Sequence, residues 1–160
     1  MIRKVLHLPD PQLRKKSLAV AINEVKTGKY KRFICDLIET MKANDGIGLA
    51  APQVGKLVRI VIISTKSGPL ALVNPVISVR SWRKCVDEEG CLSVPGIYGD
   101  VKRNTSLKVK AISADGARIE FRARGLFARV IDHEVDHLNG VLFIDKAKNI
   151  KSAENQKKEL

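Results

Sequence analysis

The sequence has few aromatic residues, few histidines and no long hydrophobic run. Aromatic residues are only 4% of the 160 residues, so a core must be mainly aliphatic. No stretch approaches the roughly 18 apolar residues of a membrane span, and the first residues lack the apolar segment of a signal peptide. Three cysteines cannot form a closed set of disulfides. We therefore expect a cytoplasmic protein with free thiols and no membrane contact.

Basic residues are abundant by contrast. The chain has 29 Lys and Arg against 17 Asp and Glu, a formal net charge of +12. This excess favours polyanionic partners without identifying one. The length predicts a single domain, and a hydrophobic content of 44% is that of an ordinary globular protein.

Hydrophobic periodicity predicts an α+β fold. Helical spacing indicates a short helix opening near Pro11 and longer helices over residues 25–44 and 126–138. Strand patterns cover residues 57–63, 70–73 and 107–111, the last leading through the Asp115-Gly116 turn into a further strand, and Pro75 predicts an edge or a break. We expect mostly antiparallel strands packed around a central metal-binding helix. Residues 1–146 form one catalytic domain in this interpretation, and residues 147–160 a polar, Lys-rich tail or frayed helix.

The strongest chemical signal is the segment His133-Glu134-Val135-Asp136-His137 within the third predicted helix. Residues four apart share a helix face, so His133 and His137 can bind one metal ion. Glu134 directly follows His133 and so lies off the face that the two histidines share, where its carboxyl group can face a metal-bound water molecule instead. A catalytic site also needs a third ligand and an open coordination position.

Cysteine is the best candidate for the third ligand. Phe143 stands where an extended metalloprotease motif has its third histidine, the two downstream glutamates lie in the polar tail, and His7 is isolated between leucines. Cys35 is expected to be buried in a helix core, and Cys85 lies among basic residues. Cys91 follows a glycine, which permits close backbone approach.

A third segment, GIGLAAPQVG at residues 46–55, lacks the pattern of a phosphate-binding or dinucleotide-binding loop. It is either a tight apolar turn or a place where glycines leave backbone groups free for a ligand. Gln53 is its single side-chain amide.

Taken together, GIGLAAPQVG, EGCLSVPG and HEVDHLNG resemble the three signature motifs of peptide deformylases, in that family's order and approximate spacing. The resemblance extends to about Asp145. It implies removal of the formyl group from the N-terminal methionine of newly synthesised proteins, with release of formate.

The resemblance also implies residue roles. Cys91, His133 and His137 would hold one divalent ion with water as the fourth ligand, Fe²⁺ natively and Zn²⁺, Ni²⁺ or Co²⁺ in some preparations. The metal-bound water would attack the formyl carbon, with Glu134 as general base and acid. The side-chain amide of Gln53 and the backbone N–H of Leu92 would stabilise the oxyanion.

For the substrate, the backbones of Ile47, Gly48 and Gly90 would pair with the peptide as an added strand. Val130 and Leu126 lie on the same helical stripe as His133, so they can line a methionine pocket or belong to the core. Many bacterial members have arginine at the position of Tyr98; the version here resembles plastid-type and some bacterial members.

Two other functions remain open from the sequence. A zinc endopeptidase could use the same histidine pair, and a non-catalytic basic module could hold a structural metal and bind ribosomal RNA. We expect a bacterial cytoplasmic location, with a trimmed organellar form as the alternative. The basic surface and the Lys-rich tail are candidate ribosome contacts for an enzyme of nascent chains.

Overall fold

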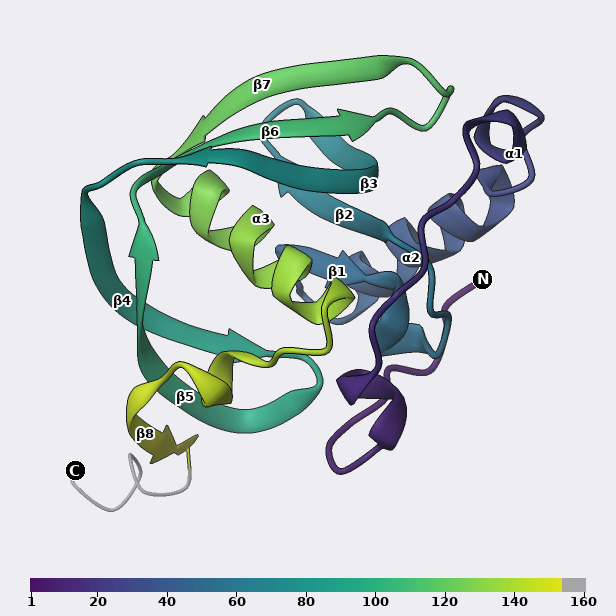
Figure 1. Cartoon of the computed structure of the whole chain (residues 1–160). Helices are drawn as coiled ribbons and strands as arrows, with labels where there is room; N and C mark the ends of the chain where they lie inside the picture. The colour runs from purple at the N-terminus through teal and green to yellow at the C-terminus, as the bar shows by residue number, and fades with distance from the viewer. Residues whose placement is uncertain (154–160) are drawn as a thin grey trace.

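The computed structural model describes residues 1–153 and shows two antiparallel sheets with a helix between them (Figure 1). The larger sheet has the strand order β1-β2-β3-β6-β7, and the smaller has the order β4-β5-β8. The strands are β1 (Gly48–Ala50), β2 (Ile60–Thr65), β3 (Gly68–Arg80), β4 (Lys84–Cys91), β5 (Val94–Asn104), β6 (Ser106–Ile112), β7 (Arg118–Arg124) and β8 (Lys148–Ser152). The helices are α1 (Ile22–Lys26), α2 (Lys31–Ala43) and α3 (Gly125–Leu138), with short 3₁₀ turns η1 (Pro11–Arg14), η2 (Ala51–Val54) and η3 (Phe143–Asp145).

The expected α+β class with antiparallel strands is confirmed, since every pair of named strands is antiparallel. No helix in residues 1–153 is long and apolar enough to cross a membrane.

Helices cover both faces of the larger sheet at β2. Ile60 and Ile62 pack in the cluster that contains α2, whereas Val61 and Ile63 pack in the cluster that contains α3. Burial on both faces explains why β2 is a continuous apolar run rather than an alternating one.

Helix α3 begins and ends close to the predicted bounds. Gly125 precedes Leu126 with a φ of 57°, and Gly140 follows the helix with a φ of 74°, a left-handed conformation that favours glycine. Figure 1 shows α3 crossing between the larger sheet and β4–β5. Its histidines are therefore held inside the molecule.

One element prediction needs correction, and another is confirmed. The single helix expected over residues 25–44 is two helices, because Gly28 takes a φ of 79° in the turn between α1 and α2. The expected edge or break at Pro75 is confirmed, because the pairing of β3 with β2 ends at Val73, although β3 itself continues to Arg80. The register shifts between Val73 and Val76, and this bulge removes Pro75 from the hydrogen-bonded ladder.

Other corrections concern Cys35 and the C-terminal residues. Cys35 is exposed, because the buried stripe of α2 runs through Phe33, Ile34 and Leu37 and leaves position 35 outside it. Residues 148–152 form β8, which pairs with β5, so the folded region continues past residue 146. The remaining tail prediction, at residues 154–160, lies outside the described residues.

Candidate metal centre and its cleft

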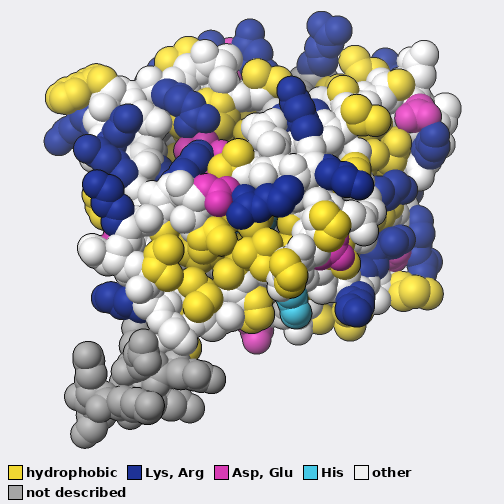
Figure 2. Space-filling model, turned by 60° about the horizontal axis from the view of Figure 1, so that its bottom comes forward, with side chains coloured by type: hydrophobic (Ala, Val, Ile, Leu, Met, Phe, Trp, Pro, Cys, Tyr) yellow, Lys and Arg dark blue, Asp and Glu magenta, His cyan; other side chains and the backbone are white. Residues whose placement is uncertain are grey.

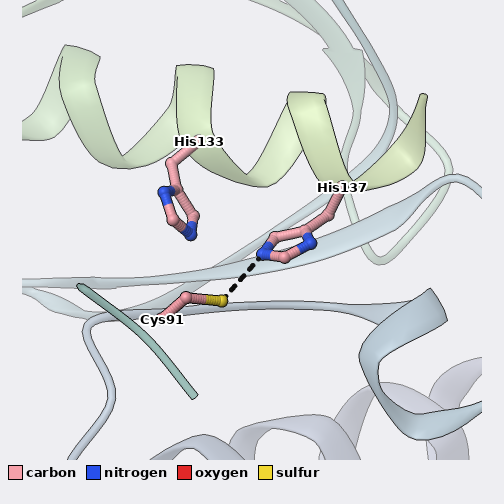
Figure 3. Close-up of side chains that lie close together, drawn as sticks. All are labelled: Cys91, His133 and His137. Atoms are coloured by element: carbon pink, nitrogen blue, oxygen red, sulfur yellow. Dashed lines mark hydrogen bonds between the residues drawn. The ribbon is translucent and has the colours of Figure 1, made fainter. Parts of the chain in front are cut away.

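Three candidate ligands from two distant parts of the chain meet beside α3. His133 and His137 lie one turn apart on the helix, with ring centroids 4.9 Å apart, and Cys91 is the last residue of β4 (Figure 3). The Cys91 Sγ atom lies 3.2 Å from His137 Nε2. The three potential ligand atoms, one from each residue, all lie within 4.8 Å of one another. Such a set suits a single ion that retains an open coordination position.

The environment of the imidazoles fits metal binding. His133 Nδ1 donates to Glu89 Oε2 at 3.0 Å, which leaves Nε2 for the centre. Burial keeps the pKa of His137 well below its ordinary value, so this ring is neutral, the form that binds metals. Burial also opposes the charged form of His133, but the hydrogen bonds that it donates to Cys91 and Glu89 raise its pKa to about 10. Binding of an ion therefore releases a proton there.

Glu134 lies beside the three ligand residues and is 4% exposed. Burial raises its pKa to about 7. Its Oε2 has no hydrogen-bond partner within residues 1–153, and its Oε1 lies against the backbone of Gly48. A carboxyl group with a pKa near neutrality can both accept and return a proton at physiological pH.

Gln53, in η2, faces the same centre. Its Oε1 accepts a hydrogen bond from the Ala50 N–H at 2.8 Å, which fixes the direction of the amide. Its Nε2 donates to Ser93 Oγ at 3.1 Å and lies 3.5 Å from Cys91 Sγ. Leu92 directly follows Cys91, so its backbone amide is also adjacent to the centre.

A cleft of about 660 Å³ opens beside this centre. The structure places all the expected substrate-binding residues in its wall: Ile47, Gly48, Gly90, Leu126 and Val130. Val130 is buried, whereas Ile47 and Leu126 are 54% and 64% exposed. Leu126 is therefore part of the cleft rather than of the core.

Tyr98 also lines the cleft, and its ring packs over Gly90. A side chain at position 90 would bring its Cβ to 2.8 Å from the ring, so this approach requires glycine. His7 lies at the cleft wall as an exposed residue and is absent from the ligand group.

A buried ionic network supports the centre, and it is barely visible in the sequence. Arg103 is 3% exposed and contacts the carboxylates of Glu89, Asp132 and Asp136. Burial opposes the charged form of Glu89, but hydrogen bonds from His133 and Arg103 hold its pKa at about 2. The sequence sign of this network is Glu89, two positions before Cys91, because alternate residues of a strand share a face and Glu89 therefore lies on the same side as the metal ligand.

Comparison with known proteins agrees with this arrangement. The sequence model of the polypeptide deformylase family matches residues 2–153. A protein named peptide deformylase 1 from Clostridium acetobutylicum is 50% identical over 145 residues, covering 91% of this chain and 94% of that protein. The crystal structure of peptide deformylase from Thermotoga maritima is 40% identical with a TM-score of 0.87, covering 92% and 99% of the two chains.

A further solved structure carries a bound peptide. It is a class I type b peptide deformylase from Acinetobacter baumannii with Met-Ala-Ser, 33% identical with a TM-score of 0.87, covering 91% of this chain and 98% of that one. Neither an endopeptidase nor a non-catalytic metal module is favoured by these relatives. The chain belongs to the peptide deformylase family, metal-dependent hydrolases that remove the formyl group from the N-terminal methionine of nascent proteins.

Proposed function

We propose that this chain hydrolyses N-formylmethionyl peptides with one divalent ion held by Cys91, His133 and His137. The observation that carries the proposal is the convergence of these three ligand atoms beside the buried carboxyl group of Glu134. A bound ion supplies Lewis acidity, which lowers the pKa of water and polarises a carbonyl oxygen. One thiolate and two imidazoles suit several first-row ions, and we propose Fe²⁺ natively, with Zn²⁺, Ni²⁺ or Co²⁺ as substitutes.

Glu134 is the proton carrier in this proposal. Its Oε2 is free of hydrogen bonds within residues 1–153 and accepts a proton from the attacking water. The same oxygen then delivers that proton to the amine nitrogen that leaves. A pKa of about 7 supports both transfers, because neither protonation state is strongly favoured at neutral pH.

Gln53 and Leu92 stabilise the negative charge on the formyl oxygen. The bond from Ala50 N–H to Gln53 Oε1 directs the Nε2 donor toward Cys91, and the Leu92 N–H comes from the residue beside that ligand. Fixed donors in a site with little water are effective, and losing one costs about 2.7–4 kcal/mol of transition-state stabilisation.

The peptide pairs with two open strand edges. β1 is the outer strand of the larger sheet and β4 the outer strand of the smaller one, and both contribute to the cleft. We propose that the backbones of Ile47, Gly48 and Gly90 bond to the peptide there. Leu126 and Val130 then cover the methionine side chain.

The decisive assay is formate release from formyl-Met-Ala by the iron-loaded protein. A Glu134→Ala variant should lose about 10²–10⁴-fold in kcat. Glu120→Ala, which removes an exposed carboxylate on β7, is the matched control and should retain activity. Equal activity of wild type and Glu134→Ala would refute the proton-carrier role. Cleavage of unformylated internal peptides without formate would instead indicate an endopeptidase.

Metal analysis of protein purified without oxygen tests the identity of the ion. Iron at one equivalent per chain, lost in a Cys91→Ala variant, is expected. Stoichiometric zinc in the anaerobic wild type would contradict the proposal of Fe²⁺.

We infer a bacterial cytoplasmic location rather than a trimmed organellar form, because the relatives reported above are bacterial.

Nascent chains are the substrates, so contact with the ribosome would be useful. In Figure 2, Lys and Arg side chains surround an area of hydrophobic side chains and outnumber acidic ones on the face shown. Such a charge balance supports contact with ribosomal RNA through the basic surface and the tail.

A further inference from the structure

One face of the larger sheet is partly uncovered. α2 packs on this face over β1, β2 and the first half of β3, in the cluster that includes Val73 and Ile112. Lys108 and Lys110 lie on the same side of β6 as Ile112, because alternate strand residues share a face. Within residues 1–153, the helices reach this side only at one end: Ile112 belongs to the cluster with α1 and α2, Lys26 lies against Gly116 in the β6–β7 turn, and no other residue of β6 or β7 belongs to that cluster. α3 packs on the opposite side.

The uncovered face is strongly basic. We define the basic sheet face as the outward side chains of β6 and β7, of which five are cationic and one is acidic: Lys108, Lys110, Arg118, Arg122, Arg124 and Glu120. Its net charge of +4 is a third of the +12 of the whole chain. Both lysines share the single carboxylate of Glu120. The three arginines form no salt bridge within residues 1–153.

A hollow and an exposed aromatic side chain lie at one end of this face. The hollow has a volume of about 90 Å³ and is lined by Val79, Ser81, Ser106, Lys108 and Arg122. Trp82 directly follows Ser81 and is 88% exposed, the highest value among the large hydrophobic side chains of residues 1–153. Because an indole ring so exposed has few contacts within the protein to lose, it can stack on a nucleobase.

We propose that the basic sheet face binds the phosphate backbone of structured RNA, with Trp82 stacking on an unpaired base at its end. Cationic side chains repeat along two paired strands, which matches a polyanion better than a single small anion. The addition of an exposed tryptophan favours a ligand with unpaired bases. This inference rests on the proposed contact with ribosomal RNA and gives it a location separate from the tail.

The position of this face is compatible with catalysis. The cleft is formed by β1, β4 and α3, and α3 lies on the other side of the sheet from the basic side chains. RNA on the basic sheet face therefore leaves the cleft accessible, so one molecule can hold RNA and a nascent peptide together.

Fluorescence anisotropy with a labelled RNA stem-loop tests the proposal on the full chain. An Arg118→Ala/Arg122→Ala variant should bind at least tenfold more weakly at low salt. The slope of log K against log salt should become shallower by about 1.5–2, since two phosphate contacts are lost. Trp82→Ala should weaken binding about five- to 150-fold without changing the slope, because stacking releases no counterions.

Lys15→Ala/Lys16→Ala is the matched control. It removes two exposed charges near the C-terminal end of α3, where Ser17 N–H bonds to the Leu138 carbonyl, whereas β7 leads into the N-terminal end of that helix. This variant should keep the wild-type affinity and slope. Formate release is measured on the same samples, so loss of RNA binding and loss of hydrolysis are distinguished, and retained activity shows that each variant is folded. An Arg118→Gln/Arg122→Gln pair repeats the test if the alanine variant is unfolded.

Three results would overturn the proposal. The first is an unchanged affinity and slope in the arginine variant. The second is an equal loss in the lysine control, which would show that only total charge matters. The third is binding to vesicles of anionic phospholipid with no binding to RNA.

Discussion

Replacing Gly48 by alanine places a methyl group against the proposed proton carrier. Gly48 lies in β1 with a φ outside the left-handed region, so its backbone does not itself require glycine. The added Cβ would lie 2.9 Å from both Glu134 Cδ and Val130 Cγ1, and closer still to Glu134 Oε1. Carbon atoms normally pack at about 3.5–4.0 Å. The Glu134 carboxyl group must therefore withdraw by at least about 0.6 Å.

The expected consequence is a loss of activity larger than the loss of stability. A misplacement of about 1 Å at a reacting group costs on the order of 10²-fold in rate, so we expect kcat to fall about 10- to 100-fold. Overpacking costs about 1–3 kcal/mol of unfolding free energy. The protein should remain folded.

A double-mutant cycle checks the reasoning. Urea unfolding is measured for the wild type, Gly48→Ala, Glu134→Ala and the double variant, together with formate release for the first two. If the methyl group acts through Glu134, Gly48→Ala should cost much less stability in the Glu134→Ala background. The same cost in both backgrounds, or an unchanged kcat in Gly48→Ala, would refute the argument.

Three further predictions concern the surroundings of the centre. Glu89→Gln leaves Arg103 buried with less compensation, so the free energy of unfolding should fall by about 3–5 kcal/mol in urea titrations; a fall under 1 kcal/mol would contradict the network. The pKa of Glu89 is held at about 2, below its ordinary 4.5, so its contribution to stability is complete above pH 4.5 and is lost as the pH falls toward 2. Acid unfolding followed by circular dichroism should show a weaker pH dependence in Glu89→Gln, and identical profiles would exclude this cause. Gln53→Ala should lower kcat/KM for formyl-Met-Ala about 10²–10³-fold with near-normal metal content, and an unchanged kcat/KM would remove the amide from the oxyanion role.

Several features could be predicted because they depend on local sequence. The helix carrying His133 and His137 follows from the spacing of its apolar residues, and its ends follow from two glycines with left-handed backbones. The exposure of Cys35 was mispredicted, because its place beside a buried stripe depends on how α2 is rotated against the sheet.

Strands β4 and β5 were not recognised, since glycines, a proline and charged residues interrupt any regular apolar alternation. The hairpin of β4 and β5 places the charged side chains of Glu89 and Arg103 on the face toward α3. Aliphatic residues at these positions would have given the alternating apolar pattern that marks a strand. Residues 148–152 looked like a tail for a similar reason. Their pairing with β5 uses backbone hydrogen bonds, which composition does not reveal.

The sequence by itself determined the three motifs, the helical pairing of two histidines and the family. These depend on residue identity and on short-range spacing, both of which can be read directly from the sequence. Only the tertiary structure decided that Glu89 holds His133, that Gly48 gives room to Glu134, and that one basic face of the sheet stays uncovered. Each of these depends on contacts between segments at least 40 residues apart or on which faces the helices cover. Such relations are fixed by packing, and no local pattern encodes them.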